Sequence, residues 1–246
     1  MTARAVRRYG SPPSPVFSRI LLFDIDGTLL LSGGAGYRAL NRAFEELFRV
    51  AHGFDDIPVA GMTDETILTA ALARASVAAD RETRARFHTR YCELFADEIH
   101  FPGPRKGLMP GVTALLETLS RQDEVRCGLV TGNFATPAQI KLEHFAIWGF
   151  FHFGAYGDDA PMRDDLVPIA VERARRAGVT VAAAHDVVVI GDTPLDVQCA
   201  TVAGARSVAV ATGSYDEAAL RETGAHTVLA DFSDTATVVD LLLAPR

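Results

Sequence analysis

Two carboxylates separated by one residue, Asp24 and Asp26, follow a short apolar run and are the first candidates for chemistry. Residues two apart point to the same side of an extended segment, so both side chains can face one small volume. Two anions that close repel each other unless a cation or a shared proton compensates them. Gly27 then permits a tight turn, and Thr28 offers a hydroxyl and a backbone N–H beyond it. The stretch predicts a site for a hard metal ion and an anionic substrate; a strand end with a simple turn is the alternative.

A second candidate follows the apolar run at 125–130, where the chain reads Thr131, Gly132 and Asn133. A hydroxyl and turn amides at the end of a buried strand can bind a phosphoryl oxygen. The same triplet is also typical of an ordinary strand-to-helix turn, so its meaning depends on the other motifs.

A third candidate is the acidic pair at the end of the apolar run 187–190, formed by Asp192 and Asp196. Together with Asp24 and Asp26, these residues would supply the oxygen ligands that Mg²⁺ prefers. Asp196 also completes a capping-box pattern with Thr193, in which an acid near a helix N-terminus is favourable. The metal-binding role and the capping role of Asp196 are compatible.

A phosphate site also needs a cation that neutralises the nucleophile and the phosphate. Arg163 follows the predicted strand 151–156 and directly precedes a helix, so we expect it to reach the same edge. Lys141 competes for this role, but we expect its place about two turns into a helix to keep it away from that edge. A solvated surface cation is the alternative for either residue.

The elements that must position these residues alternate between strand and helix. The continuous apolar run at 20–23 predicts a buried strand of a parallel sheet, and ligands of such sheets bind at the carboxyl edge. Further strands are predicted at 125–130, 151–156, 187–190, 207–211 and 227–229, and helices at 112–119, from 136, at 165–177, from 193, at 216–223 and at 235–243. This order predicts an α/β fold with a doubly wound parallel sheet.

Residues 34–100 interrupt the alternation, because none of them has the pattern of a buried strand. Apolar spacing predicts helices at 37–50, 64–75 and 81–99, with Asp64 as an N-cap, and a Pro- and Gly-rich return linker follows. The expected organisation is a flexible tail at 1–18, a core domain at 19–32 and 107–246, and an all-helical domain at 33–106.

Composition excludes several classes of protein. The chain has 246 residues, of which 48% are hydrophobic and 22% charged, which is ordinary for a globular protein. A formal net charge of -7 argues against a nucleic-acid or membrane-surface binder, and no apolar run reaches transmembrane length. Three cysteines without metal-ligand spacing, and a tail without a secretory signal, indicate a cytoplasmic protein, either monomer or homodimer.

Taken in order, F-D-I-D-G-T-L, L-V-T-G-N and G-D-T-P-L-D resemble motifs of the haloacid dehalogenase-like (HAD) superfamily, over residues 20 to about 213. The resemblance implies a Rossmann-like core, a helical C1 cap, Mg²⁺ and an aspartyl-phosphate intermediate. It implies these roles: Asp24 as nucleophile and metal ligand, Asp26 as general acid/base with a metal-binding carbonyl, Thr131 on the phosphoryl group, and Asp192 and Asp196 at the metal. The third motif departs from the family, because Arg163 replaces the usual lysine and its Pro-rich turn; arginine is a larger, forked and permanently charged cation.

The segment G-M-T-D at 61–64 resembles phosphoglycolate phosphatase-like members, so Thr63 and Asp64 are expected near the substrate. A loop followed by an N-cap is the alternative interpretation of these two residues. The complete set of expected substrate-binding residues is Gly27, Thr28, Thr63, Asp64, Thr131, Gly132 and Asn133.

These features predict a Mg²⁺-dependent phosphatase for a small phosphorylated metabolite, phosphoglycolate-like, with no nucleic-acid or membrane partner. A phosphotransferase or mutase of the β-phosphoglucomutase type would share every core residue and differ in the cap, so it remains an alternative. A haloacid dehalogenase needs neither a metal nor an acid at Asp26. A non-catalytic binding module would not require the intact set of aspartates.

Overall fold

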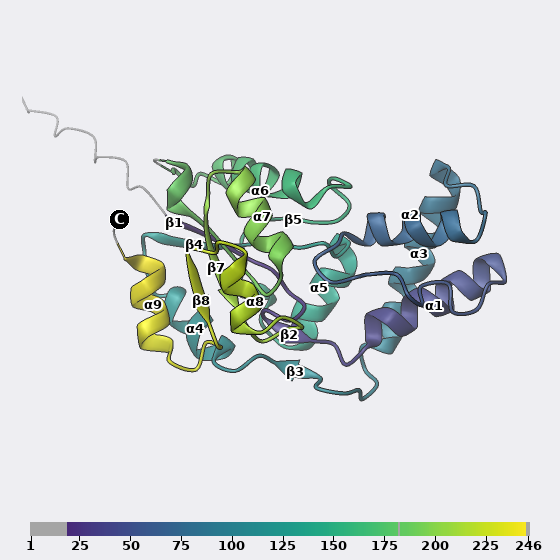
Figure 1. Ribbon diagram of the computed structural model, residues 1–246, viewed down its shortest axis with the longest axis horizontal. Helices are drawn as coiled ribbons and strands as arrows, with labels where there is room; N and C mark the ends of the chain where they lie inside the picture. Colours follow the sequence, from purple (N-terminus) through teal and green to yellow (C-terminus); the bar gives the residue numbers. More distant parts are fainter. Residues whose placement is uncertain (1–18, 182, 245–246) are drawn as a thin grey trace, which may run out of the picture.

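The computed structural model describes residues 19–181 and 183–244, so the tail predicted at 1–18 lies outside the described residues. Its centre is a six-stranded parallel sheet in the order β5-β4-β1-β6-β7-β8 (Figure 1). The strands are β1 (Arg19–Phe23), β4 (Val125–Val130), β5 (Gly154–Ala155), β6 (Val187–Gly191), β7 (Arg206–Val210) and β8 (Thr227–Leu229). The predicted α/β fold with a doubly wound parallel sheet is confirmed.

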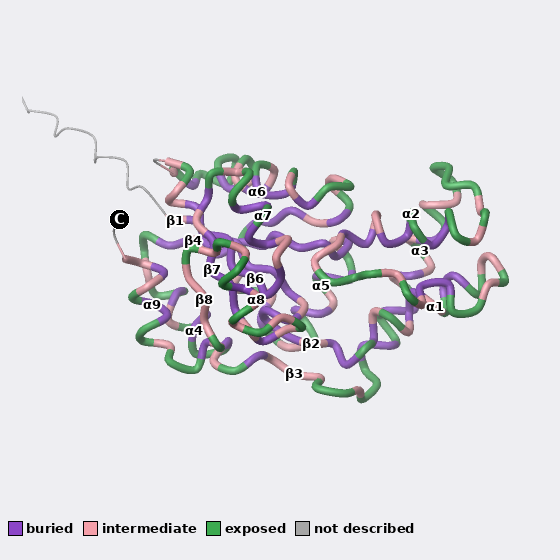
Figure 2. The backbone as a smooth tube through the Cα atoms, viewed as in Figure 1, coloured by how far each residue is buried: buried purple, intermediate pink, exposed green. Residues whose placement is uncertain are grey.

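Strand register brings the chemical motifs to one edge. Phe23, the last residue of β1, pairs with Leu129 in β4 and with Ile190 in β6. The residues that follow these strands therefore emerge side by side at the carboxyl edge, where ligands of such sheets bind. Strands β1, β4 and β6 are almost wholly buried (Figure 2), which explains their continuous apolar sequences.

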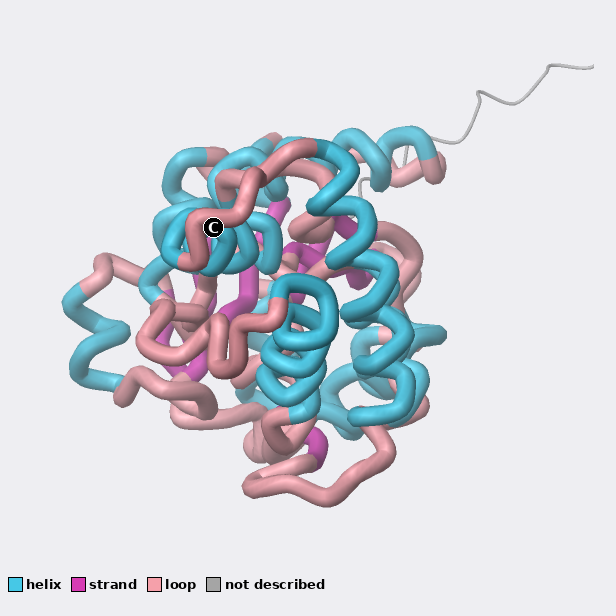
Figure 3. Tube along the Cα trace, turned by 90° about the vertical axis from the view of Figure 1, so that its right-hand side faces the viewer, coloured by secondary structure: helices cyan, strands magenta, loops and turns pink. Residues whose placement is uncertain are grey.

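Helices cover both faces of the sheet and enclose the strands (Figure 3). One hydrophobic cluster joins one sheet face to α4 (Val112–Leu119), α5 (Ala135–His144) and α9 (Thr235–Leu243). A second cluster joins the other face to α6 (Leu166–Arg176) and α7 (Pro194–Val202), while α8 (Glu217–Glu222) packs beside β7 and β8. Across the described ranges, no helix is both long and apolar enough to cross a bilayer.

Three helices stand apart from the sheet at one end of the molecule (Figure 1). They are α1 (Ala35–Phe48), α2 (Asp64–Arg74) and α3 (Arg81–Glu98), and they share a separate hydrophobic cluster. The two connections to this helical region pair antiparallel through β2 (Leu30–Leu31) and β3 (Gly107–Leu108). Gly33 and Gly103 touch there, since a Cβ at position 103 would lie 1.9 Å from the Gly33 carbonyl oxygen.

Helix starts agree with the sequence prediction at one site and differ at two. Thr193 caps α7 in a capping box with Asp196, as predicted. The N-cap of α2 is Thr63, whose hydroxyl accepts the Thr66 amide, so the prediction of Asp64 was one residue late. The helix predicted from 136 is α5, which already begins at Ala135.

Candidate active site

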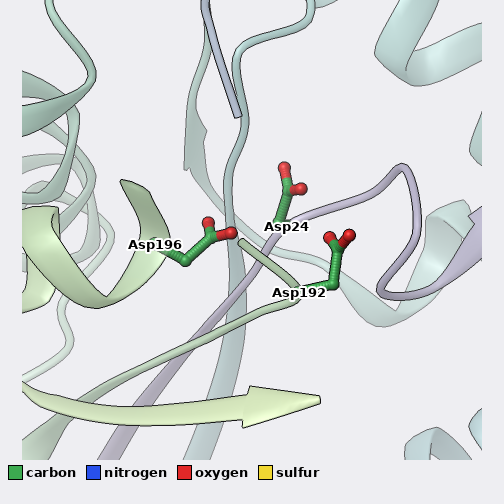
Figure 4. A group of neighbouring side chains, drawn as sticks. All are labelled: Asp24, Asp192 and Asp196. Carbon is green, nitrogen blue, oxygen red and sulfur yellow. The ribbon is translucent and has the colours of Figure 1, made fainter. Parts of the chain in front are cut away.

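Three buried aspartates form a compact cluster at the carboxyl edge of the sheet. Asp24 follows β1, Asp192 follows β6, and Asp196 lies in the first turn of α7. One carboxylate oxygen from each residue lies within 4.8 Å of those of the other two, and Figure 4 shows the three carboxyl groups converging. The sequence predicted that these three aspartates meet at the carboxyl edge of the sheet, and they do so in the structure.

The Asp192 carboxylate occupies a space that neighbouring residues leave for it. Thr28 donates a 3.0 Å hydrogen bond from its hydroxyl to Asp192 Oδ1. A Cβ at Gly27 would lie 2.4 Å from Asp192 Oδ2, and one at Gly213 would lie 1.7 Å from the same atom. At position 27 the φ of +83° also favours glycine. Gly27 and Gly213 therefore leave room for the Asp192 carboxylate, which is a type of side chain that binds metal ions.

The cluster is electrostatically crowded. Burial raises the pKa of Asp24 to about 6, and the Arg163 guanidinium opposes that rise. Burial also raises the pKa of Asp192 to about 8, and the charges of Asp24 and Asp196 add to it. A bound divalent cation would lower these pKa values instead, because it stabilises the ionised carboxylates. Three converging carboxylates are hard oxygen donors, and this donor set fits Mg²⁺.

Arg163 is buried against the same cluster from the short 3-10 turn η2 (Arg163–Asp165). Its Nη2 lies 3.1 Å from Asp24 Oδ1 and also forms an ion pair with Asp196. Its Nη1 donates a 3.0 Å hydrogen bond to the Gly61 carbonyl, in the loop before α2. Arg163 thus joins two of the three carboxylates to the helical region, at the edge where the sequence predicted it.

A second cation lies on Asp26, outside the three-carboxylate cluster. The Lys141 ammonium lies 2.5 Å from Asp26 Oδ2 and 2.6 Å from Asn133 Oδ1. The Asn133 amide donates to the same Asp26 oxygen at 2.8 Å and to the Thr131 hydroxyl at 2.7 Å. Lys141, Asn133 and Thr131 therefore form one hydrogen-bonded group around the Asp26 carboxylate.

The expectation that Lys141 stays away from this edge is wrong. Helical side chains point back toward the N-terminus of their helix, and α5 runs away from the sheet edge. The long Lys141 side chain therefore points toward the start of α5. Its ammonium nitrogen lies 5.6 Å from the centre of the Phe95 ring. Both Lys141 and Arg163 are buried in the site, each on a different aspartate.

The loop after β4 is clamped to the helical region by Asp64. The Asp64 amide donates to the Gly132 carbonyl at 2.7 Å, and its carboxylate accepts the Phe134 amide at 2.9 Å. Gly132 has no room for a side chain, since a Cβ there would lie 2.1 Å from the Met62 carbonyl oxygen. The two regions therefore meet backbone to backbone beside Thr131.

Most of these groups border one cavity of about 430 Å³ between the sheet edge and helices α1–α3, a size suited to a small ligand, whereas Asp196 does not line it. Asp24, Asp26, Asp192, Thr131, Lys141 and Arg163 all line it. Of the expected substrate-binding residues, Gly27, Asp64, Gly132 and Asn133 line it too. Thr28 and Thr63 do not, because their hydroxyls are engaged with Asp192 and with the Pro161 carbonyl.

Several polar residues that line the cavity were not predicted from the sequence, and Tyr91 and Arg105 are two of them. Tyr91 lies in α3 and is 1% exposed, yet it borders the cavity. Arg105 lies in the return linker, where it donates to the Thr212 carbonyl at 2.9 Å. Neither position carries a local motif, so no sequence signal points to them.

Comparison with known proteins places the chain among enzymes. Residues 21–201 match the family model of haloacid dehalogenase-like hydrolases. The phosphoglycolate phosphatase of Rhodospirillum rubrum is 30% identical, with 93% of this chain and 92% of that protein covered. The phosphoglycolate phosphatase of Cereibacter sphaeroides is 27% identical, with 91% and 99% covered.

A solved structure shares the fold. The crystal structure of a predicted phosphoglycolate phosphatase from Haemophilus somnus superposes with a TM-score of 0.67 at 18% identity. The alignment covers 90% of this chain and 98% of that one. At this identity the likeness shows the architecture alone, with the helical region included in the matched length.

Proposed function

The chain belongs to the family of haloacid dehalogenase-like hydrolases, and on that basis we propose that it is a Mg²⁺-dependent phosphatase of a small phosphomonoester. The observation that carries the proposal is the meeting of Asp24 and Asp192, two members of the buried carboxylate cluster, with two cations and Thr131 in one cavity. The relatives named as phosphoglycolate phosphatases favour a phosphoglycolate-like substrate.

Asp24, Asp192 and Asp196 would hold the ion, together with the Asp26 backbone carbonyl. The ion supplies positive charge that offsets the repulsion between an attacking carboxylate and a phosphate dianion. Arg163 adds charge on the Asp24 side of the cavity, and Lys141 adds it on the Asp26 side. Thr131 offers its hydroxyl to a phosphoryl oxygen, and the Asn133 amide holds that hydroxyl and the Asp26 carboxylate in place.

In the proposed reaction, an Asp24 oxygen attacks phosphorus and forms an aspartyl phosphate, while the bond from phosphorus to the ester oxygen breaks. Asp26 gives its proton to the departing alkoxide and then takes a proton from the attacking water. Hydrolysis of the aspartyl phosphate releases inorganic phosphate and regenerates Asp24. Lys141 and Asn133 orient the Asp26 carboxylate for both proton transfers.

Water must be excluded while the leaving group departs, and helices α1–α3 form the opposite wall of the cavity. We assign residues 33–106 to a cap domain and residues 19–32 and 107–246 to the core domain. The separate hydrophobic cluster of α1–α3 and the paired connections β2 and β3 support this division.

The test is phosphate release from a panel of small phosphomonoesters, phosphoglycolate included, with Mg²⁺ and with EDTA. Release that requires Mg²⁺ and disappears in Asp24→Asn is the expected result. Release that persists in EDTA or in Asp24→Asn would overturn the proposal. Transfer of phosphate to a second sugar phosphate, without release, would instead identify the phosphotransferase alternative.

A further inference from the structure

The side of the cavity formed by helices α1–α3 and the loop before α2 consists mainly of apolar side chains. Six aliphatic or aromatic residues line it, and we call them the apolar wall: Tyr37, Leu40, Val59, Met62, Ile67 and Tyr91. Leu40, Ile67 and Tyr91 are buried. Tyr37 and Val59 are 44% and 46% exposed. The apolar wall therefore combines buried side chains with two that are in contact with solvent.

The two exposed members of the apolar wall indicate a binding surface. Tyr37 and Val59 belong to a small set of large hydrophobic side chains that are exposed across the described ranges, and both border this one cavity. Apolar side chains that gather at a cavity and remain in water mark ligand sites, because covering them releases that water. A ligand gains from this wall only with an apolar surface of its own.

The cations that line the cavity come from other parts of the chain and already have partners. Among the described residues they are Arg105, Lys141 and Arg163, and none of them belongs to α1–α3. Lys141 and Arg163 form ion pairs with aspartates of the site. Arg105 lies in the return linker and donates to the Thr212 carbonyl. The apolar wall therefore contains no cation that could bind an anionic leaving group.

The charged side chain that α1–α3 do contribute to the cavity, within the described ranges, is an acid. Asp64 begins α2, lines the cavity and is buried, and its carboxylate accepts the Phe134 amide. A carboxylate on the leaving group would meet a like charge on this side and would lose its water without gaining a cation. An apolar leaving group avoids both costs and covers the exposed side chains.

We propose that the leaving group of the substrate is an uncharged, apolar alcohol that packs against the apolar wall while the phosphate binds at the carboxylate cluster. Hydrolysis then releases this alcohol and inorganic phosphate. The proposal rests on the proposed phosphatase function and assigns its leaving group from the residues of this chain. On that point it departs from phosphoglycolate, which the names of the relatives favour. The cavity of about 430 Å³ falls in the range of pockets that enclose drug-sized ligands, so a leaving group larger than glycolate has room.

Binding of two phosphonates that cannot be hydrolysed tests the proposal by calorimetry in Mg²⁺. The probes differ only in the group expected to meet the apolar wall. In 3-phosphonopropionate this group is a carboxylate, and in 3-methylbutylphosphonate a neutral isopropyl group of similar shape replaces it. The protein should bind the second probe at least about tenfold more tightly, because only the isopropyl group gains from transfer out of water onto apolar side chains.

Val59→Arg supplies a cation to the apolar wall at an exposed position, where the fold tolerates a charged side chain. It should lower the ratio of the two affinities at least about tenfold, by strengthening binding of the carboxylate probe. Val202→Arg is the matched control, because Val202 is 64% exposed on α7 and does not line the cavity. The same change of charge there should leave the ratio unaltered.

Equal affinity of the unmodified protein for the two probes, or tighter binding of 3-phosphonopropionate, would overturn the proposal, and so would an unchanged ratio in Val59→Arg. Since binding needs no turnover, tighter binding of the apolar probe without phosphate release from any ester would count against the phosphatase function alone. Phosphate release combined with tighter binding of the carboxylate probe would support that function and overturn the apolar leaving group.

Discussion

A hydrogen bond joins Asp64 and Phe134 across the boundary between the helical region and the sheet, because the Phe134 amide donates to the Asp64 carboxylate at 2.9 Å. The Phe134 ring is 2% exposed and belongs to the hydrophobic cluster of α1–α3, where it contacts the rings of His88 and Tyr91. A residue that directly follows Thr131, Gly132 and Asn133 is therefore anchored in the opposite region. The loop that we propose binds phosphate is held between the sheet and the helices.

Phe134→Ala should lower the free energy of unfolding by about 3–5 kcal/mol, because it removes a buried ring from a packed cluster. Urea denaturation measures this change. Phe101→Ala is the control, since that ring is 55% exposed and its loss should cost within about 0.5 kcal/mol. Equal effects of the two substitutions would show that the Phe134 anchor adds no stability.

Asp64→Asn should stabilise the protein increasingly as pH rises. Burial raises the pKa of Asp64 from 3.8 to about 6, so the folded state binds its proton more tightly than the unfolded chain. Stability from this group is therefore present below pH 3.8 and is lost as pH rises to about 6. The variant escapes that loss, which amounts to at most about 3 kcal/mol at pH 7.

Thermal unfolding at pH 4 and pH 7 measures the Asp64 effect as the difference between variant and parent. Asp80→Asn is a control of opposite sign, because the Thr83 amide bonded to Asp80 holds the pKa of that carboxyl below its usual value. That variant should gain nothing at pH 7. A constant difference between Asp64→Asn and the parent at the two pH values would contradict the assignment.

Asp192→Asn should raise the melting temperature at pH 7 in EDTA by at least about 2 °C, because burial raises the pKa of Asp192 to about 8 and the variant does not have to take up a proton on folding. The same variant should lose most of the stabilisation that Mg²⁺ gives the parent. Differential scanning fluorimetry across a Mg²⁺ titration shows both effects. Asp123→Asn, at an exposed position, should change neither, and an unaltered Mg²⁺ titration in Asp192→Asn would remove Asp192 from the metal site.

The two cations should differ in what their loss changes. Arg163→Leu should lower the free energy of unfolding by about 3–5 kcal/mol in EDTA, because Asp24 and Asp196 lose their buried partner. Saturating Mg²⁺ should recover part of that loss. Chemical denaturation with and without Mg²⁺ measures it, and an equal loss in both conditions would show that the ion and Arg163 act on different carboxylates.

Lys141→Met should lower kcat at least about tenfold, because Asp26 loses the ammonium that orients it. Steady-state kinetics on the best substrate measures the change. Lys106→Met is the control, since this other lysine donates to the backbone carbonyls of Ile99 and Phe101 instead. An unchanged kcat in Lys141→Met would show that Arg163 alone supplies the positive charge that the reaction needs.

The sequence predicted the parts of the site that depend on local pattern. Asp24 and Asp192 each end a buried apolar run, and parallel strands place such ends at one edge, so their proximity followed from topology. The capping box of Thr193 and Asp196 spans three residues and was equally predictable.

The remainder depends on contacts between distant residues. Thr28 and Asp192 are 164 positions apart, and Thr63 meets Pro161 across 98, so no local pattern reveals that both hydroxyls are engaged away from the cavity. The position of the Lys141 ammonium depends on the direction in which its long side chain points along α5, which the helix prediction alone does not give. Tyr91 is buried like a core residue, and only the three-dimensional packing of the helices shows that it borders the cavity.

The pairing of β2 with β3 and the contact of Gly33 with Gly103 also bear on how such a protein can diversify. The chain leaves the sheet-bearing region and returns to it at neighbouring points, so the stretch between Leu31 and Gly107 begins and ends at one place on that region. Recombination at these two points would replace the substrate-facing wall with that of a relative while leaving every strand of the parallel sheet uncut. New substrate ranges could thus arise by a single gene exchange, without redesign of the carboxylate cluster.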